Sequence, residues 1–253
     1  MRLCPNSNSA LPRELALLAP CSSGASGFCQ LEVNRSWHAT LLEKAQRLRG
    51  SVYLEQNAVT PAQLAPGGRH IQEVDDVAWH LLTVERTGEV SGCARFMLHA
   101  DSASWSDLAI SRSALARCET WGGKLRAAVE EELAFARRER LGFVELGGWA
   151  LKSALRCTTE AARMMLATYA LSRWLGGAVG ISTANRFCSA PLLRRIGGRA
   201  VVASGVELPP YFEPRFNCEV EVLRFDSSNP NPRYGRWIDE VQSSLAAVRI
   251  VSA

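Results

Sequence analysis

Apolar positions along this chain follow two different periods in turn, and this alternation predicts an α/β (α+β) fold. Residues 36–49 place leucine and alanine side chains on one helical face, with Ser36 as the N-cap. Residues 80–98 hold two apolar runs on either side of Thr87 and Gly88. Runs of this kind around a short turn are typical of an antiparallel hairpin.

The second half of the chain continues the alternation, and a strand, a helix and a second strand in its middle predict a βαβ unit. Glycines 176 and 177 mark the end of the helix in this unit. Pro191 suggests a first-turn position or a kink in the next helix. The expected strands are 143–150, 178–184, 199–210 and 218–226, and the expected helices are 115–141, 160–175, 185–198 and 235–251.

The first 34 residues break the pattern. They are rich in Ser, Pro, Gly and Asn and show no sustained periodicity, which predicts a flexible or loosely packed leader. Residues 35–253 are then expected to form one domain that ends in a helix.

Composition and charge narrow the class of protein. The 253 residues are 47% hydrophobic and 21% charged, enough for a sizeable core, and the net charge of +4 is dispersed. The chain lacks the basic run of a nucleic-acid arm and an apolar run of about 20 residues that could span a bilayer. Its eight cysteines contain no CxxC pair, so we expect free thiols, no metal site and a cytoplasmic location.

One stretch, residues 143–167, combines a carboxylate with a strand that leads into a helix. Glu145 lies on the apolar run, Gly147 and Gly148 follow it, and a turn at 156–159 precedes the helix. The unpaired N–H groups at a helix N-terminus favour anions, above all phosphates. The stretch therefore predicts a binding site for a phosphate-bearing ligand.

The order of elements and this turn resemble the GNAT acyltransferase superfamily, whose fold is a mixed central sheet flanked by helices. The superfamily's phosphate-binding turn runs Arg or Gln, two residues, Gly, one residue, Gly or Ala. Arg156 and Ala161 match this pattern, and Thr159 replaces the first glycine. In the superfamily's later helix motif, Leu193 stands where a tyrosine acid is usual.

Upstream segments are similar to a narrower branch, the acyl-homoserine lactone (autoinducer) synthases and the N-acyl amino acid synthases. The matching positions are Arg49, Tyr53, Asp75, Asp76, His80, Gly92 and Arg95. The resemblance implies that the donor is a long acyl chain on acyl carrier protein, and that Glu145 is the branch's strand glutamate. The segment LGGWA lacks the arginine that follows this glutamate in the lactone synthases, which favours the N-acyl amino acid synthases.

Acyl transfer to an amine requires a held donor, a stabilised oxyanion and a base. Glu145 is the candidate base because a carboxylate on a core strand is costly unless it has a use; the alternative is a solvent-facing edge glutamate. His80 is a candidate proton relay, or else a histidine satisfied within the core. Residues Arg156, Thr159, Glu160 and Ala161 are the candidate phosphate site, whose alternative is a capping turn with a solvent-facing arginine.

A charge network is expected upstream, where Arg95 ends an apolar strand and Asp75 and Asp76 precede one. It would order the loop or bind a substrate carboxylate, with Tyr53 beside it, and a purely structural ion pair is the alternative. On the helix after the turn, an apolar stripe suits either core packing or the wall of an acyl tunnel. This stripe contains Met164, Met165, Leu166, Tyr169 and Trp174.

These features predict an N-acyltransferase that moves a long-chain acyl group from the phosphopantetheine of acyl carrier protein to an amino acid or related amine. Two alternatives stay open. One is a GNAT N-acetyltransferase that uses acyl-CoA on a small amine or a protein, and the other is a non-catalytic protein that binds an acyl carrier or ligand. Chain length, acceptor identity and oligomeric state are left undefined by the sequence.

Overall fold

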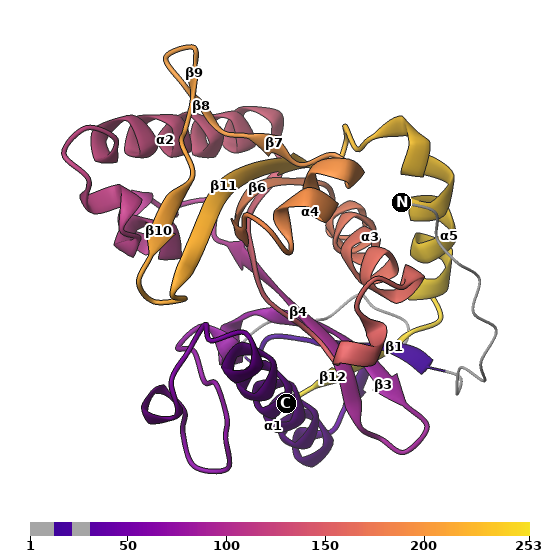
Figure 1. The fold of residues 1–253 in the computed structure, drawn as a ribbon. Helices are drawn as coiled ribbons and strands as arrows, with labels where there is room; N and C mark the ends of the chain where they lie inside the picture. Colours follow the sequence, from indigo (N-terminus) through magenta and orange to yellow (C-terminus); the bar gives the residue numbers. More distant parts are fainter. Residues whose placement is uncertain (1–12, 22–30) are drawn as a thin grey trace.

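The computed structural model describes residues 13–21 and 31–253, and one mixed sheet runs through this described part (Figure 1). The strands of the sheet are β1 (Arg13–Leu18), β2 (Leu31–Val33), β3 (Trp79–Glu85), β4 (Val90–His99), β5 (Gly142–Leu151), β6 (Ala178–Asn185), β7 (Arg199–Ala200), β10 (Tyr211–Glu213), β11 (Cys218–Asp226) and β12 (Arg249–Ser252). Their order across the sheet is β10-β11-β6-β5-β4-β3-β1-β12-β2, with β7 also paired to β11. A separate ribbon contains β8 (Val202–Ala203) and β9 (Val206–Glu207).

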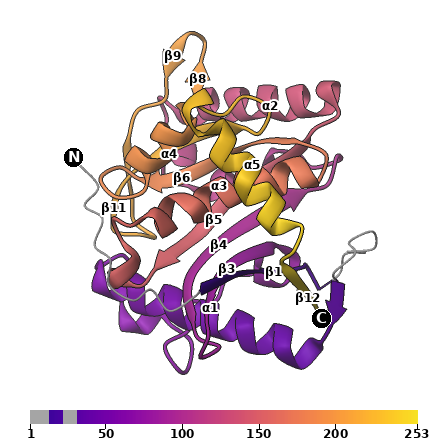
Figure 2. The ribbon, with the colours of Figure 1, turned by 90° about the vertical axis from the view of Figure 1, so that its right-hand side faces the viewer.

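Helices cover both faces of the sheet. The α-helices are α1 (Arg35–Glu55), α2 (Gly122–Glu139), α3 (Thr159–Trp174), α4 (Ala190–Ile196) and α5 (Gly235–Leu245). The 3-10 helices are η1 (Pro61–Gln63), η2 (Asp75–Val77), η3 (Trp105–Asp107), η4 (Ala109–Arg112), η5 (Leu115–Arg117), η6 (Ser153–Leu155) and η7 (Pro232–Tyr234). Helices α3, α4 and α5 pack on one face, and α1 and α2 cover separate halves of the other (Figure 2). The predicted GNAT-like mixed sheet flanked by helices is confirmed.

The two local motifs that the sequence predicts are both present. Strands β3 and β4 form the antiparallel hairpin, and Gly88 adopts a positive φ of 78° in its turn. Strands β5 and β6 pair in parallel on either side of α3, which is the βαβ unit. Thr158 caps α3 by accepting a hydrogen bond from the N–H of Glu160, and the helix begins at Thr159, one residue before the predicted start.

The expected leader is wrong for residues 13–18 and 31–33. Strand β1 lies inside the sheet between β3 and β12, and the side chains of Leu15, Leu17 and Leu18 are buried. A strand that is buried on both faces reads as a continuous apolar run without alternation, which is why periodicity did not reveal it. Residues 1–12 and 22–30 of the expected leader lie outside the described part.

The expected final helix is correct only as far as Leu245. Residues 249–252 form β12, which pairs in parallel with β1 on one side and β2 on the other. Ile250 is fully buried in the core that α3 and α5 share with the sheet. The run RIVS is short and β-branched, and the adjacent helical pattern concealed it.

This placement of β12 predicts a small, site-specific loss of stability. We expect Ile250→Val to lower the free energy of unfolding by about 0.5–1.5 kcal/mol, because it removes one buried methyl group. Urea denaturation measures the change. Ile71→Val is the matched control, since Ile71 is 48% exposed and its replacement should leave stability unaltered.

Two further elements are shorter than predicted. The helical pattern over 115–141 becomes η5 and then α2, which starts at Gly122. The helix expected from Asn185 starts at Ala190 with Pro191 in its first turn, as one of the two predicted placements allows. Asn185 instead organises the preceding turn, where its side-chain oxygen accepts hydrogen bonds from the N–H groups of Phe187 and Cys188.

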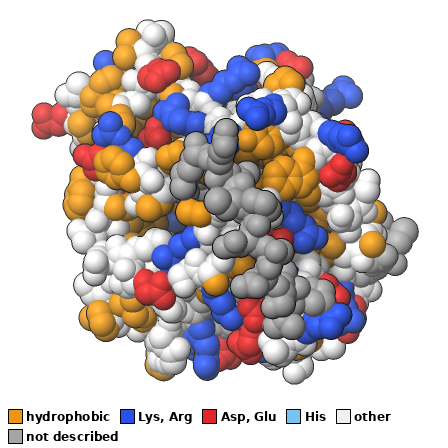
Figure 3. Space-filling model, turned by 45° about the vertical axis from the view of Figure 1, so that its right-hand side comes forward, with side chains coloured by type: hydrophobic (Ala, Val, Ile, Leu, Met, Phe, Trp, Pro, Cys, Tyr) orange, Lys and Arg blue, Asp and Glu red, His pale blue; other side chains and the backbone are white. Residues whose placement is uncertain are grey.

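The outer surface carries charges of both signs. Lys and Arg side chains are interspersed with Asp and Glu on the face drawn in Figure 3, and Arg173 pairs with Asp239 at 2.9 Å. Exposed pairs of this kind add little stability and are typical of a solvated surface. Within the described residues, every helix is too short or too polar to cross a membrane.

Candidate functional site

Strands β5 and β6 separate part-way along their length, and this point defines the candidate site. Their last paired residues are Leu146 and Ser182; beyond them, among the described residues, β5 pairs with β4 and β6 pairs with β11. The register between β4 and β5 shifts just after this point: Gly147 still pairs with Arg95, and Gly148 and Trp149 lie opposite Ala94 as a bulge. Gly148 has a φ of 60°, a conformation that glycine adopts without strain.

A buried ion pair lies against this bulge. Helix α1 places Arg49, whose side chain is 1% exposed, beside Asp75 at the start of η2. The Nη1 group of Arg49 donates to Oδ1 of Asp75 at 2.9 Å, and Nη2 donates to Oδ2 and to the carbonyl of His70 at 2.8 Å. The side-chain amide of Gln46 and the N–H of Gln72 also donate to Asp75, at 3.2 and 3.1 Å. The carboxylate is therefore fully engaged.

A second arginine shares the same carboxylate. Arg95 on β4 is 11% exposed; its Nη1 donates to the side-chain oxygen of Gln72 and lies 3.5 Å from Asp75. Its Nη2 group makes no hydrogen bond within the described residues, and a Cβ built on Gly147 would lie 3.3 Å from it. Two guanidinium groups thus compete for one carboxylate, and that of Arg95 lies beside Gly147 with a donor that is free among the described residues.

The protonation states leave this cluster positively charged at neutral pH. Burial raises the pKa of Asp75, but hydrogen bonding and the charge of Arg49 outweigh it, and the pKa falls to about 2. Burial, with the charge of Arg49 next, lowers the pKa of both His70 and His80 to about 4, so neither histidine is charged. The groups of this cluster therefore carry a net charge of about +1.

The structure separates the two aspartates that the sequence groups together. Asp75 is in the network, whereas the side chain of Asp76 is exposed and its carbonyl accepts from the N–H of Cys21. The prediction that Asp76 belongs to the network is therefore wrong, because one residue of advance in a 3-10 turn points the side chain outward. The network joins Arg95 to Asp75 as predicted.

His80 and Tyr53 lie beside the network, where His80 contacts the backbone of Asp75 and Tyr53 contacts the ring of His70. His80 is fully buried, and its Nε2 lies 2.8 Å from the carbonyl oxygen of Asp75. The Tyr53 ring packs edge-on against His70 at 5.0 Å, and burial raises the pKa of its phenol to about 12. In these positions His80 holds the η2 backbone, and its proposed relay role stays a prediction.

Glu145 lies on the same sheet face as Arg95. Its oxygens accept hydrogen bonds from the N–H of Ala109 at 2.8 Å and the N–H of Ile110 at 3.0 Å, and Nε2 of His99 lies 3.0 Å away. A carboxylate offers about four lone-pair positions, so one acceptor position remains. Its side chain is 14% exposed, and it both anchors η4 and keeps access to solvent.

The predicted phosphate site lies where α3 begins. Nη2 of Arg156 pairs with Glu55 at the end of α1 at 3.0 Å, so this arginine has a protein partner. The N–H of Glu160 donates to the Thr158 cap, and the Glu160 carboxylate lies in the first helical turn. Thr159 and Ala161 contribute the other first-turn N–H groups. The phosphate-binding role of these residues stays a prediction, and the Glu160 carboxylate would compete with an added anion.

Several residues of the cluster carried no signal in the sequence. Gln46 and Gln72 are ordinary polar residues until the fold brings them to Asp75, and periodicity offered no means of selecting them. His99 was detectable, because alternation along β4 places it on the same face as Arg95. Among the described residues, no group of three His, Cys, Asp or Glu side chains is arranged to hold a metal ion.

Comparison with known proteins bears on the fold. No protein-family model and no curated protein matches the chain. One similar solved structure is that of BjaI, described as a CoA-dependent acyl-homoserine lactone synthase with SAM and isopentyl-CoA. Its TM-score is 0.58 at 15% sequence identity, and the match covers 96% of this chain and 94% of that one. LasI, an AHL synthase, gives a TM-score of 0.51 at 14% identity, covering 87% and 91%. The chain therefore has the fold of the acyl-homoserine lactone synthases.

Proposed function

We propose that this protein is an N-acyltransferase that moves an acyl group from a phosphopantetheine thioester to the amine of an amino acid. The observation that carries the proposal is the buried pair of Arg49 and Arg95 around the single carboxylate of Asp75, beside the point where β5 leaves β6. A buried excess of positive charge is costly unless an anion completes it. The carboxylate of an amino acid has the charge and the two oxygens that the site requires.

Arg95 is the group that would bind this carboxylate. Its Nη2 is free within the described residues, whereas Arg49 is held by Asp75 and His70. Because Gly147 lacks a side chain, a substrate could approach Nη2 over this residue. The acceptor would then lie on the sheet face between Arg95 and Glu145.

The reaction follows from this placement. The amine nitrogen attacks the thioester carbonyl, a C–N bond forms, and the C–S bond breaks to release the thiol of phosphopantetheine. Beyond Leu146 and Ser182 the facing edges of β5 and β6 do not pair with each other among the described residues, and they would supply N–H donors for the amide arm and the developing oxyanion. Glu145, through its remaining acceptor position and a water molecule, would take the amine proton.

Acyl carrier protein is the donor that we favour. The Glu160 carboxylate and the side chain of Thr159 at the start of α3 disfavour the close approach of a diphosphate such as that of CoA, whereas a single phosphate needs less room. Acyl-CoA is the second candidate, because BjaI is described as CoA-dependent. Comparing turnover of the same acyl group on the two carriers distinguishes them.

The acceptor assignment has a direct test. We expect the protein to acylate leucine in preference to 3-methylbutylamine, which lacks only the carboxylate, and Arg95→Gln to reduce this preference by about 10- to 100-fold through loss of a charged hydrogen bond. Mass spectrometry of products from a mixture of both amines measures the ratio. Arg194→Gln is the control, since Arg194 pairs with Glu221 on α4 and β11. An unchanged ratio in Arg95→Gln would contradict the carboxylate site.

A further inference from the structure

His99, the last residue of β4, contacts the candidate base Glu145 on the neighbouring strand. In the β4–β5 register His99 lies opposite Phe143, two residues before Glu145, so the two side chains are diagonal neighbours on one face of the sheet. Nε2 of His99 lies 3.0 Å from Oε2 of Glu145. The imidazole is 6% exposed and packs against the ring of Phe143 at 6.1 Å. This packing limits the orientations that the imidazole can adopt.

The two oxygens of the Glu145 carboxylate are used unequally. Oε2 has two partners, the N–H of Ala109 at 2.8 Å and Nε2 of His99. Oε1 accepts a hydrogen bond from the N–H of Ile110 at 3.0 Å and from no other described residue. Each carboxylate oxygen has two lone-pair positions, so Oε2 is filled and one position on Oε1 is open. The contact with His99 therefore decides which oxygen remains available.

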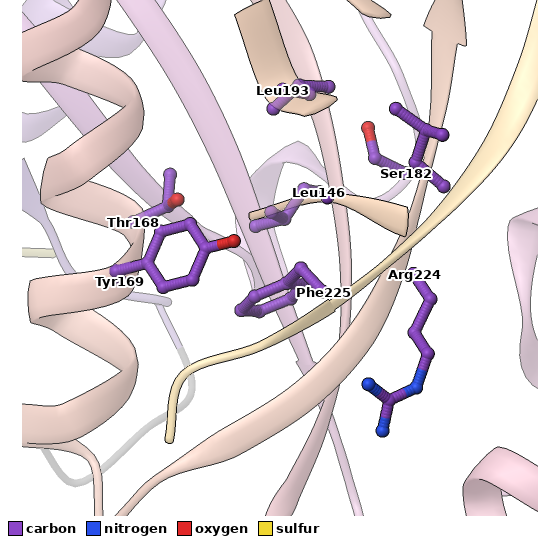
Figure 4. Close-up of a pocket in the computed structure, with 9 residues that line it drawn as sticks. Leu146, Thr168, Tyr169, Ser182, Leu193, Arg224 and Phe225 are labelled. Atoms are coloured by element: carbon purple, nitrogen blue, oxygen red, sulfur yellow. The ribbon is translucent and has the colours of Figure 1, made fainter. Parts of the chain in front are cut away.

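The opposite face of the sheet offers no substitute for this base. The next residue along β5, Leu146, points to that face and lies there among Tyr169 and Phe225 (Figure 4). The described residues that line the small space beside Leu146 include no carboxylate and no imidazole. We therefore assign proton acceptance at the separation of β5 and β6 to the Glu145 face.

We propose that His99 is a positioning residue for acyl transfer: its Nε2–H group occupies Oε2 of Glu145, so that Oε1 receives the amine proton. An ionised carboxylate only accepts hydrogen bonds, so the ring nitrogen that faces it carries a hydrogen atom. The inference rests on the proposed function, in which Glu145 takes the proton through a water molecule. As the C–N bond forms, an N–H bond of the amine breaks, the water accepts this proton and passes one of its own to Oε1. Such a base is efficient only when its acceptor position is aligned.

Three substitutions of His99 test this role. Gln places its side-chain amide near the position of Nε2 and can still donate to Glu145, whereas the shorter Asn places the same amide near Nδ1. We expect His99→Leu and His99→Asn to lower kcat by about 10- to 100-fold, as for a lost hydrogen bond to a charged group, and His99→Gln to stay within about threefold of the wild type. KM for leucine should change by less than about twofold, because its carboxylate would be bound by Arg95. Steady-state kinetics measure both constants.

A double-mutant cycle separates this role from a purely structural one. If His99 acts through the Glu145 carboxylate, His99→Leu should lower kcat by less than about twofold in a protein that already carries Glu145→Gln. A histidine that only stabilises the sheet would lower kcat to the same extent in both backgrounds. That result would overturn the inference.

The hydrogen bond also has a readout that is independent of activity. The chain has four histidines, and in protein with ¹⁵N-labelled histidine the ring resonances that disappear in His99→Gln belong to His99. We expect the ¹⁵N chemical shift of its Nε2 to be that of a protonated nitrogen at pH 7. An unprotonated Nε2, equal losses of kcat in His99→Gln and His99→Asn, or wild-type kcat in His99→Leu would each contradict the role of His99. If Nε2 is protonated but the wild-type protein acylates no amine, acyl transfer is refuted while the hydrogen bond to Oε2 stands.

Discussion

Replacing Asp75 by Asn is expected to lower the free energy of unfolding by about 3–5 kcal/mol, because it leaves two buried guanidinium groups without a carboxylate. The substitution keeps the shape of the side chain, so the loss reports on charge and hydrogen bonding rather than on volume. Urea denaturation at pH 7 measures it. Asp76→Asn is the matched control one residue away, and its exposed side chain should contribute less than about 0.5 kcal/mol.

The same variant should respond differently to acid. In the folded protein the pKa of Asp75 is about 2, below its ordinary value of 3.8, so its contribution is complete above pH 4 and is lost as the pH falls toward 2. His70 and His80 have folded pKa values of about 4, below the ordinary 6.5, so both proteins should lose stability between pH 6.5 and 4. The two stability curves should run parallel in that range and converge below pH 4. Curves that stay parallel below pH 4 would contradict the assignment.

Glu145→Gln should reduce kcat for acyl transfer by about 10²- to 10⁴-fold if this carboxylate takes the amine proton. The loss is expected in kcat, since an amide cannot accept the amine proton. Steady-state kinetics with an acyl donor and an amino acid measure it. A variant that keeps wild-type turnover would eliminate Glu145 as the base.

Glu145 also holds η4, so this experiment needs a structural control. Glu213 provides it, because this fully buried glutamate accepts a hydrogen bond from the N–H of Ala114 next to η5 at 3.0 Å. Glu213→Gln should disturb a neighbouring loop to a comparable degree and retain most of the wild-type kcat. If both variants lose activity to the same extent, loosening of the loops explains the loss.

The sequence predicted local structure well where one period dominates. The hairpin around Gly88 depends on interactions a few residues apart and is confirmed, and α3 starts within one residue of its predicted beginning. Strands β1 and β12 were not predicted, because each is short, buried on both faces and specified by partners far away in the chain. Their apolar residues were visible, but the sheet order that buries them was not.

The candidate site was predictable in part for the same reason. The resemblance named Arg49, Asp75 and Arg95 among its matching positions. The structure places both arginine side chains in contact with Asp75. The resemblance did not reveal that Asp75 is the carboxylate both arginines share, which is a property of the packed interior.

The pairing of β12 with β1 and β2 has a consequence for how the protein is made. Among the described strands β12 is the last to be synthesised, and its partners β1 and β2 are the first. While the ribosome is producing the chain between them, β1 lacks its neighbour on that side and presents an unpaired, apolar edge. Such edges associate with other chains, so nascent molecules should require chaperone protection until β12 emerges.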